Sequence, residues 1–338
     1  MELTYSLVMP ISGARFTNQI ALVLKLLAVG YKPDVILGTS GGCITGDILL
    51  LSGVNSITDS QSYREFRSRV FLILEQLDSS WYLTPWSSSL LMSRIMAVSQ
   101  GAMFGRGNGE SLISGLDVDL DSQPEMWIGT KDRTSNIHQL FCTRSQRTAK
   151  LSIPGAIYMN GDLKLATKAS VASCAVPTIV PGIDICGHTY CDGGISHASP
   201  LGPLSSLYAN DKISYHIVYI SPVRYNKRDD PHTSELEDDD TWNQLSGSMA
   251  GMVRDLHIPD RNNGIRMVGP DAKKTTCYGK SGLRRAVAMQ RCSVRSFIEV
   301  TPHCPEHLNF IEMKKGDALK SVCNALTRDD FVVRHWYV

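Results

Sequence analysis

Apolar positions follow two different periods over the first fifty residues of the chain. Residues 5–11 and 34–37 are short apolar runs, the second rich in β-branched residues, as is typical of buried strands. Between them, Asn18 is a predicted helix N-cap and Gly30 a predicted stop. The apolar positions with helical spacing in this interval are Ile20, Val23, Leu24 and Leu27. Residues 43–51 fit a buried helix, so the opening β-α-β-α order predicts a parallel sheet covered by helices on both faces.

Further elements follow downstream. The predicted helices are residues 55–78, residues 164–172, and a final helix through Ala318, Leu319, Val322 and Leu326. The predicted strands are residues 125–129, 137–142, 217–220 and 294–300. Residues 103–109 have spaced glycines but follow no clear strand, so we expect a loop that leads to a helix containing Leu112 and Ile113.

We expect one domain over residues 1–338, because no internal repeat or linker divides the chain. Its motif-bearing core spans about residues 5–222, and the C-terminal strand and helix span about residues 294–330. The charged stretch at about residues 224–241 is predicted to be a surface excursion without a chemical role.

Residues 81–86 and 90–96 are unusually rich in aromatic residues, leucine and methionine. Such residues most often pack in a core. The alternative is a mobile apolar lip over a lipid site. The sequence carries no information on exposure, so both interpretations stay open.

Composition narrows the class of protein. The 338 residues are 43% hydrophobic and 20% charged, with a net charge of +1, which does not favour nucleic acid as a partner. The nine cysteines are scattered, and the N-terminus has no basic segment followed by a long apolar run. We therefore expect reduced thiols, a cytoplasmic location and no signal peptide. No apolar run reaches the length of a membrane span, so any membrane contact is expected to be peripheral.

The strongest chemical signal is the sequence G-T-S-G-G from Gly38 to Gly42, which lies between a predicted strand and a predicted helix. This G-x-S-x-G context is typical of a nucleophile elbow, in which a tight turn lifts the serine hydroxyl clear of the sheet. Gly38 and Gly42 are small because strand and helix nearly touch there. The helix N-terminus then places backbone N–H groups beside a developing oxyanion. Ser40 is therefore the predicted nucleophile.

A serine nucleophile needs a base, and the best candidate is Asp192, followed by Gly193 and Gly194. Two glycines after an aspartate leave an open backbone at a strand end, so the carboxylate can approach another loop closely. By itself this D-G-G sequence is also a common β-turn.

Taken together, the motifs resemble the patatin family of lipid acyl hydrolases. The elbow is followed by the A-S-V-A-S-C-A-V-P segment of residues 169–177, by Pro181, by the D-G-G at Asp192 and by Ser199-Pro200-Leu201. The resemblance covers about residues 5–222, together with the final strand and helix. It implies a three-layer α/β/α patatin-like fold with a mainly parallel central sheet.

The resemblance also implies a Ser–Asp dyad in which Ser40 attacks an acyl carbonyl and Asp192 takes its proton. The expected substrate is a phospholipid or another lipid ester, and the expected activity is that of a phospholipase A or lysophospholipase. No cofactor and no metal are expected. Because the reference pKa of Asp is about 3.9, proton transfer to Asp192 requires a desolvated, apolar cleft.

The loop after the first strand departs from the family pattern. Where the family has a glycine-rich sequence ending in arginine and glycine, residues 11–16 read I-S-G-A-R-F. Gly13 and Arg15 are retained. Backbone N–H groups of Ser12, Gly13 and Gly41 are the predicted oxyanion hole, and Arg15 is expected to fix the loop rather than to bind an anionic head group.

This departure keeps a second function open, a catalytically weak patatin-fold protein that binds lipid or a partner. A third alternative is a Ser–His–Asp triad that uses His188 or His197, which lie on either side of Asp192 in the sequence. The segment from His303 to His307 contains ligand-type residues, but a structural zinc site needs four ligands and no second cluster is evident. The sequence does not indicate an oligomeric state.

Overall fold

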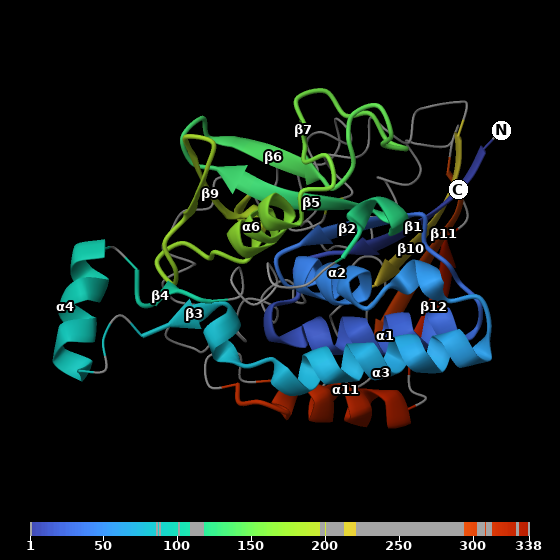
Figure 1. The fold of residues 1–338 in the computed structure, drawn as a ribbon, viewed down its shortest axis with the longest axis horizontal. Coiled ribbons are helices and arrows are strands. Elements are labelled where there is room, and N and C mark those ends of the chain that lie inside the picture. The colour runs from blue at the N-terminus through green and yellow to red at the C-terminus, as the bar shows by residue number, and fades with distance from the viewer. Residues whose placement is uncertain are drawn as a thin grey trace.

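The parallel strands of the sheet are joined by crossover helices, as the opening pattern predicts. The computed structural model describes residues 2–85, 87, 89–100, 102–108, 118–196, 200, 213–220, 294–302, 308, 313–328 and 331–336. They form a ten-stranded sheet with flanking helices (Figure 1). The strand order is β12 (Phe331–Trp336), β11 (Val294–Pro302), β10 (Ile213–Ile220), β1 (Glu2–Met9), β2 (Val35–Thr39), β5 (Glu125–Asp132), β6 (Ile137–Cys142) and β7 (Ile157–Tyr158).

Neighbouring strands from β11 to β5 are parallel, whereas β12 and β6 run antiparallel to their inner neighbours. A further strand, β9 (His188–Asp192), pairs antiparallel with the end of β5 and with β8 (Ile183–Ile185). The mainly parallel sheet with flanking helices confirms the expected α/β/α fold class.

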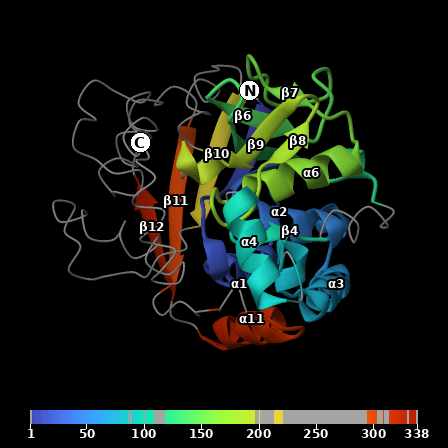
Figure 2. The ribbon, with the colours of Figure 1, turned by 90° about the vertical axis from the view of Figure 1, so that its left-hand side faces the viewer.

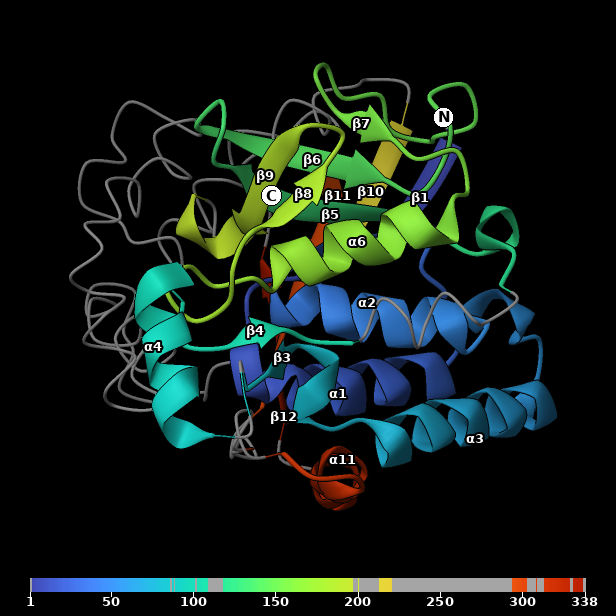
Figure 3. The same cartoon turned by 60° about the vertical axis from the view of Figure 1, so that its left-hand side comes forward.

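Helices α1 (Phe16–Ala28), α2 (Gly41–Leu51) and α6 (Leu163–Ser173) pack beside the sheet, and α3 (Ser60–Gln76) and α11 (Asp317–Thr327) lie against α1 (Figures 1 and 3). The end view in Figure 2 places α1, α2, α3 and α11 together on one side of the strands. The first two parallel strands end, and α1 and α2 begin, at the same edge of the sheet.

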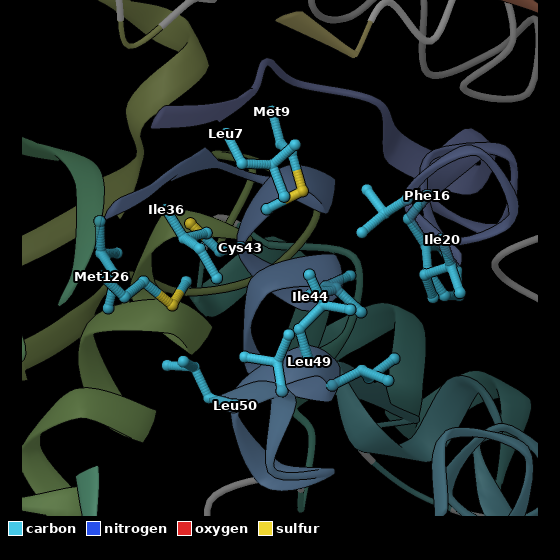
Figure 4. Close-up of a cluster of buried hydrophobic side chains, with 14 of the residues drawn as sticks. Leu7, Met9, Phe16, Ile20, Ile36, Cys43, Ile44, Leu49, Leu50 and Met126 are labelled. Carbon is cyan, nitrogen blue, oxygen red and sulfur yellow. The ribbon is translucent and has the colours of Figure 1, made fainter. Parts of the chain in front are cut away.

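Alternation along the inner strands fills a core on each face of the sheet. Leu7 and Met9 of β1 and Ile36 of β2 join the large cluster under the helices, part of which Figure 4 shows. Val8, Val35 and Leu37 point the other way and pack with Trp127, under residues 149–158. Burying each of these side chains contributes about 1.5–3 kcal/mol, so both faces hold the strands in register. The helix-side cluster contains residues from Leu7 to Val322.

Several helix boundaries differ from the sequence predictions. Asn18 was predicted as an N-cap, but this is wrong, because Asn18 is buried inside α1. A 3-10 turn at Gly13–Arg15 leads directly into the helix, so α1 begins at Phe16. The helix predicted at residues 55–78 begins only at Ser60, where the Asp59 side chain accepts from the N–H groups of Gln61 and Ser62.

Other elements were not predicted. The stretch at residues 90–96 is part of helix α4 (Leu90–Gln100), which is joined to the body by the two-stranded sheet of β3 (Leu83–Thr84) and β4 (Gly105–Arg106). Trp81 and Tyr82 pack partly buried against the core, whereas α4 stands apart from α1, α2 and α3 (Figures 1 and 3). The strands β8 and β12 were also missed. The predicted helix around Leu112 and the excursion at 224–241 lie outside the described residues.

The described cysteines are all free thiols, in agreement with the expectation of reduced cysteines: Cys43, Cys142, Cys174, Cys186, Cys191 and Cys323. Among the residues that the structure describes, no helix has the length and apolar character needed to cross a bilayer.

Candidate active site

Ser40 occupies a strained turn between β2 and α2. Its backbone has φ 53° and ψ −125°, a left-handed conformation that costs a non-glycine residue about 1–3 kcal/mol. The flanking glycines allow the close approach of the chain. A methyl group on Gly42 would lie 2.2 Å from the carbonyl oxygen of Met9, and one on Gly38 would lie 3.0 Å from the backbone of Cys43. This is the geometry that a nucleophile elbow requires.

Asp192 reaches Ser40 through the order of the strands. It ends β9, which pairs with β5 at Thr130, and β5 in turn lies beside β2. Gly193 permits the approach, because a methyl group there would lie 2.2 Å from the carbonyl oxygen of Gly129. As a result the Ser40 hydroxyl donates a hydrogen bond of 2.7 Å to Oδ2 of Asp192. The structure therefore brings together the two residues predicted as nucleophile and base.

The Asp192 carboxyl is buried, with 3% of its surface exposed. Burial raises the pKa of Asp192 from its ordinary value to about 7, although hydrogen bonds from Ser40 Oγ and the Gly194 N–H favour the ionised form. The Gly194 N–H donates to Oδ1 over 2.7 Å, so the other oxygen faces the serine. A carboxylate with a pKa near neutrality is a stronger base than an exposed aspartate.

The end of α6 holds the elbow in place. Ser173 Oγ accepts from the Ser40 N–H at 2.9 Å and donates to the carbonyl oxygen of Gly129 at 2.6 Å. The Cys174 thiol donates to the carbonyl oxygen of Ser40 at 3.2 Å. The sequence motif of residues 169–177 includes Ser173 and Cys174 but assigns neither of them a role. Their positioning contact with Ser40 needed the tertiary structure.

The predicted oxyanion loop lies against the start of α2. A methyl group on Gly41 would come within 2.4 Å of Ser12 Oγ and 2.8 Å of the Gly13 nitrogen, so the residues predicted to supply the oxyanion hole are neighbours. Gly13 has φ 48°, where glycine is favoured, whereas Ser12 has φ −138°, which a serine can adopt. Replacement of a glycine by Ser12 is therefore compatible with this backbone.

A buried glutamine that sequence reasoning missed anchors this loop. Ser12 Oγ donates to Oε1 of Gln19 at 2.8 Å, and Gln19 Nε2 donates to the carbonyl oxygens of Pro10 and Ile220 at 3.1 and 3.3 Å. The signal available in the sequence was a polar side chain on the buried face of α1. Arg15 is also buried, with 4% exposed, which fits a role in fixing the loop.

Asp47 is a second carboxyl that the sequence did not single out. Residues 40, 43 and 47 share one face of α2, so Asp47 lies two turns from the nucleophile. Ser170 Oγ donates to Oδ1 of Asp47 at 2.9 Å, and burial raises the pKa of Asp47 to about 7. Burial also raises the pKa of Tyr82, with smaller contributions from the nearby charges of Cys174 and Asp47. Burial likewise raises the pKa of the Cys174 thiol, so Asp47, Tyr82 and Cys174 lie near one another in a desolvated environment.

His188 was a rival partner for the nucleophile, and the structure pairs it elsewhere. Its Nδ1 lies 2.8 Å from Oδ2 of Asp132. His197 and the segment from His303 to His307 lie outside the described residues. Within the part of the chain that the structure describes, no group of three or more His, Cys, Asp and Glu side chains could hold a metal ion.

Comparisons with known proteins place this site in a family context. A family model described as "Patatin-like phospholipase" matches residues 13–205, a range that contains Gly13, Ser40 and Asp192. Among solved structures, the chain is similar to VipD from Legionella pneumophila at 10% identity and a TM-score of 0.32, over 98% of this chain and 68% of that chain. No curated protein matches the chain.

Proposed function

The chain belongs to the patatin-like phospholipase family, whose members are lipid acyl hydrolases, and we propose that it cleaves phospholipid or lysophospholipid esters with a Ser40–Asp192 dyad. The observation that supports this proposal most strongly is the direct hydrogen bond from Ser40 Oγ to a desolvated carboxylate oxygen of Asp192. In this arrangement the base needs no histidine between itself and the nucleophile.

The first half of the reaction forms an acyl-enzyme. Asp192 Oδ2 takes the proton from Ser40 Oγ as the oxygen attacks the acyl carbonyl carbon. The resulting oxyanion accepts hydrogen bonds from the backbone N–H groups of Gly13 and Gly41, with Ser12 beside them. When the tetrahedral intermediate collapses, the protonated Asp192 returns the proton to the leaving alkoxide of the lipid.

The second half releases the fatty acid. Asp192, again ionised, takes a proton from water as the water oxygen attacks the acyl carbon of the ester to Ser40. Collapse of this second intermediate breaks the bond to Ser40 Oγ, and the proton on Asp192 returns to the serine. Each cycle consumes one water and yields one carboxylic acid and one alcohol, so both residues return to their starting state.

Strain at Ser40 and burial at Asp192 have a common consequence. The fixed φ of Ser40 holds the hydroxyl toward Oδ2, and the Gly194 N–H holds the carboxylate plane. Neither group therefore needs to reorganise before the proton moves, which is the feature that makes a preorganised site effective.

The proposal is tested by two measurements on the purified full chain. A fluorophosphonate probe should label Ser40, and Ser40→Ala should abolish labelling. Incubation with mixed phospholipids and lysophospholipids should release fatty acids detectable by mass spectrometry, and the products define the class of lipid and the acyl position. A folded protein that neither takes up the probe nor releases fatty acid would instead support the binding function.

A further inference from the structure

Helix α4 is the tip of an arm that extends from the edge of the molecule where the active site lies. We define the arm as residues 83–106, from β3 to β4. Figures 1 and 3 show α4 beyond the ends of β1 and β2, on the side where α1 and α2 begin and therefore on the side of Ser40. The short β3–β4 sheet joins it to the body, with Thr84 Oγ1 donating to the carbonyl oxygen of Arg106 at 2.8 Å.

The base of the arm is fixed to the loop that contacts both proposed catalytic residues. The N–H groups of Met103 and Phe104 donate to the carbonyl oxygens of Thr178 and Ile179 at 2.7 and 2.8 Å. The same loop begins at Cys174, whose thiol donates to the carbonyl oxygen of Ser40, and continues to Ala175, whose carbonyl oxygen accepts from the Asp192 N–H at 3.0 Å. The arm is thus anchored to a loop that also holds Ser40 and Asp192, a few residues from the positions that contact them.

The composition of the arm is unusual for a surface element. Its 24 positions contain no Asp or Glu, and Arg94 is the single charged residue of α4. The helix sequence L-L-M-S-R-I-M-A-V-S-Q is otherwise apolar except at Ser93, Ser99 and Gln100. Met92 has 48% of its surface exposed, although a soluble surface helix typically presents charged residues to water. Apolar side chains without carboxylates are suited to the interface of a bilayer that contains anionic lipid.

We propose that α4 docks on a lipid surface containing anionic phospholipid, with Met92 entering the interface, and so brings the Ser40 site to its substrate. This inference rests on the proposed lipid hydrolase function, which supplies the reason for a lipid surface at this edge. Burial of the exposed Met92 side chain contributes to the affinity, and the lack of carboxylates on the arm avoids repulsion from anionic head groups.

The test compares binding to vesicles with hydrolysis of a soluble ester. The full chain is sedimented with vesicles of equimolar phosphatidylcholine and phosphatidylglycerol, and its activity is measured on a short-chain aryl ester below micelle formation. Met92→Glu should lower the partition coefficient by roughly tenfold or more and leave the rate on the soluble ester unchanged. Met92→Leu should restore binding. The matched control is Leu72→Glu, because Leu72 is 62% exposed on α3 and receives the same charge.

Four results would overturn the docking proposal. The wild-type protein fails to bind the vesicles, or Leu72→Glu weakens binding as much as Met92→Glu does. Alternatively, Met92→Glu abolishes hydrolysis of the soluble ester in a folded protein, which would place the arm in the catalytic cleft. Finally, the wild type forms a dimer that Met92→Glu dissociates, which would make a second copy the occupant. If vesicle binding behaves as expected while the wild type hydrolyses no ester, docking stands and the proposed function fails.

Discussion

Replacing Asp192 with Asn changes one charge in the proposed site and little else. The amide oxygen can still accept from the Gly194 N–H, as Oδ1 does now over 2.7 Å. The amide nitrogen takes the place of Oδ2, which accepts from Ser40 at 2.7 Å, and it cannot accept a proton. The variant therefore separates the chemistry of the carboxylate from the packing of the side chain.

The expected effect on stability follows from the raised pKa. An unfolded Asp ionises near 3.8, whereas folded Asp192 keeps its proton until about pH 7. The wild-type protein therefore loses folding free energy as the pH rises from 3.8 to about 7, and the loss stays constant above that. At 1.36 kcal/mol per pH unit the full loss is on the order of 4 kcal/mol. Asp192→Asn lacks this loss, so it should be more stable at pH 8 and about equally stable at pH 4.

The expected effect on activity has the opposite sign. A positioned general base contributes about 10²–10⁴ in rate, or roughly 3–5 kcal/mol in the activation free energy. Asp192→Asn should lose at least this factor in kcat/KM on a soluble aryl ester. A lost activity together with a gained stability indicates a desolvated catalytic carboxylate, whereas a carboxylate whose hydrogen bonds lower its pKa, such as Asp132, stabilises the fold when ionised.

Urea unfolding from pH 4 to pH 8 measures the difference, and Asp132→Asn is the matched control. Asp132 is also almost fully buried, and although burial raises the pKa of Asp132, hydrogen bonds from Ser135 and His188 outweigh this and lower the pKa. Asp132→Asn should therefore destabilise the protein at pH 8. The reasoning is refuted if Asp192→Asn shows no gain at pH 8 relative to pH 4 while Asp132→Asn behaves as expected, or if Asp192→Asn keeps near wild-type turnover.

Three further predictions concern the same site. Both Ser40→Gly and Ser40→Ala should be inactive. Ser40→Gly should be about 1–3 kcal/mol more stable than Ser40→Ala, because glycine tolerates φ 53°. Equal urea midpoints for the two variants would contradict the strain at Ser40. The kcat/KM should rise with pH around the Asp192 pKa of about 7, and Asp47→Asn should keep that midpoint; loss of the midpoint would assign the titration to Asp47. Gly42→Ala should destabilise the fold by several kcal/mol and abolish activity, since its methyl would lie 2.2 Å from a β1 carbonyl oxygen. The methyl of Gly13→Ala meets no atom within 4 Å, so this variant should lose only about 1–2 kcal/mol of folding free energy, from the positive φ of residue 13. Comparable thermal unfolding of the two variants would be evidence against this difference.

Sequence reasoning succeeded where the signal is local. Strand β6 was predicted with its observed bounds, and α2 and α6 to within two residues at each end, because each is a short segment rich in apolar or small residues with flanking turn or polar residues. It failed where polar residues are buried by long-range packing. Asn18 is an N-cap residue type but lies inside α1, and Gln19 beside it anchors the oxyanion loop.

The sequence by itself determined the family, the fold class and the two candidate catalytic residues, because these depend on short motifs and on their order along the chain. Tertiary structure decided which groups meet. Strand order places β9 beside β5 and so brings Asp192 to Ser40 across 152 residues, and packing of α2 on α6 creates the desolvated region at Asp47 and Ser170. The tertiary structure likewise decided the φ of Ser12 and the outward position of α4. These features depend on contacts between residues distant in the chain, and no periodicity within a segment encodes such contacts.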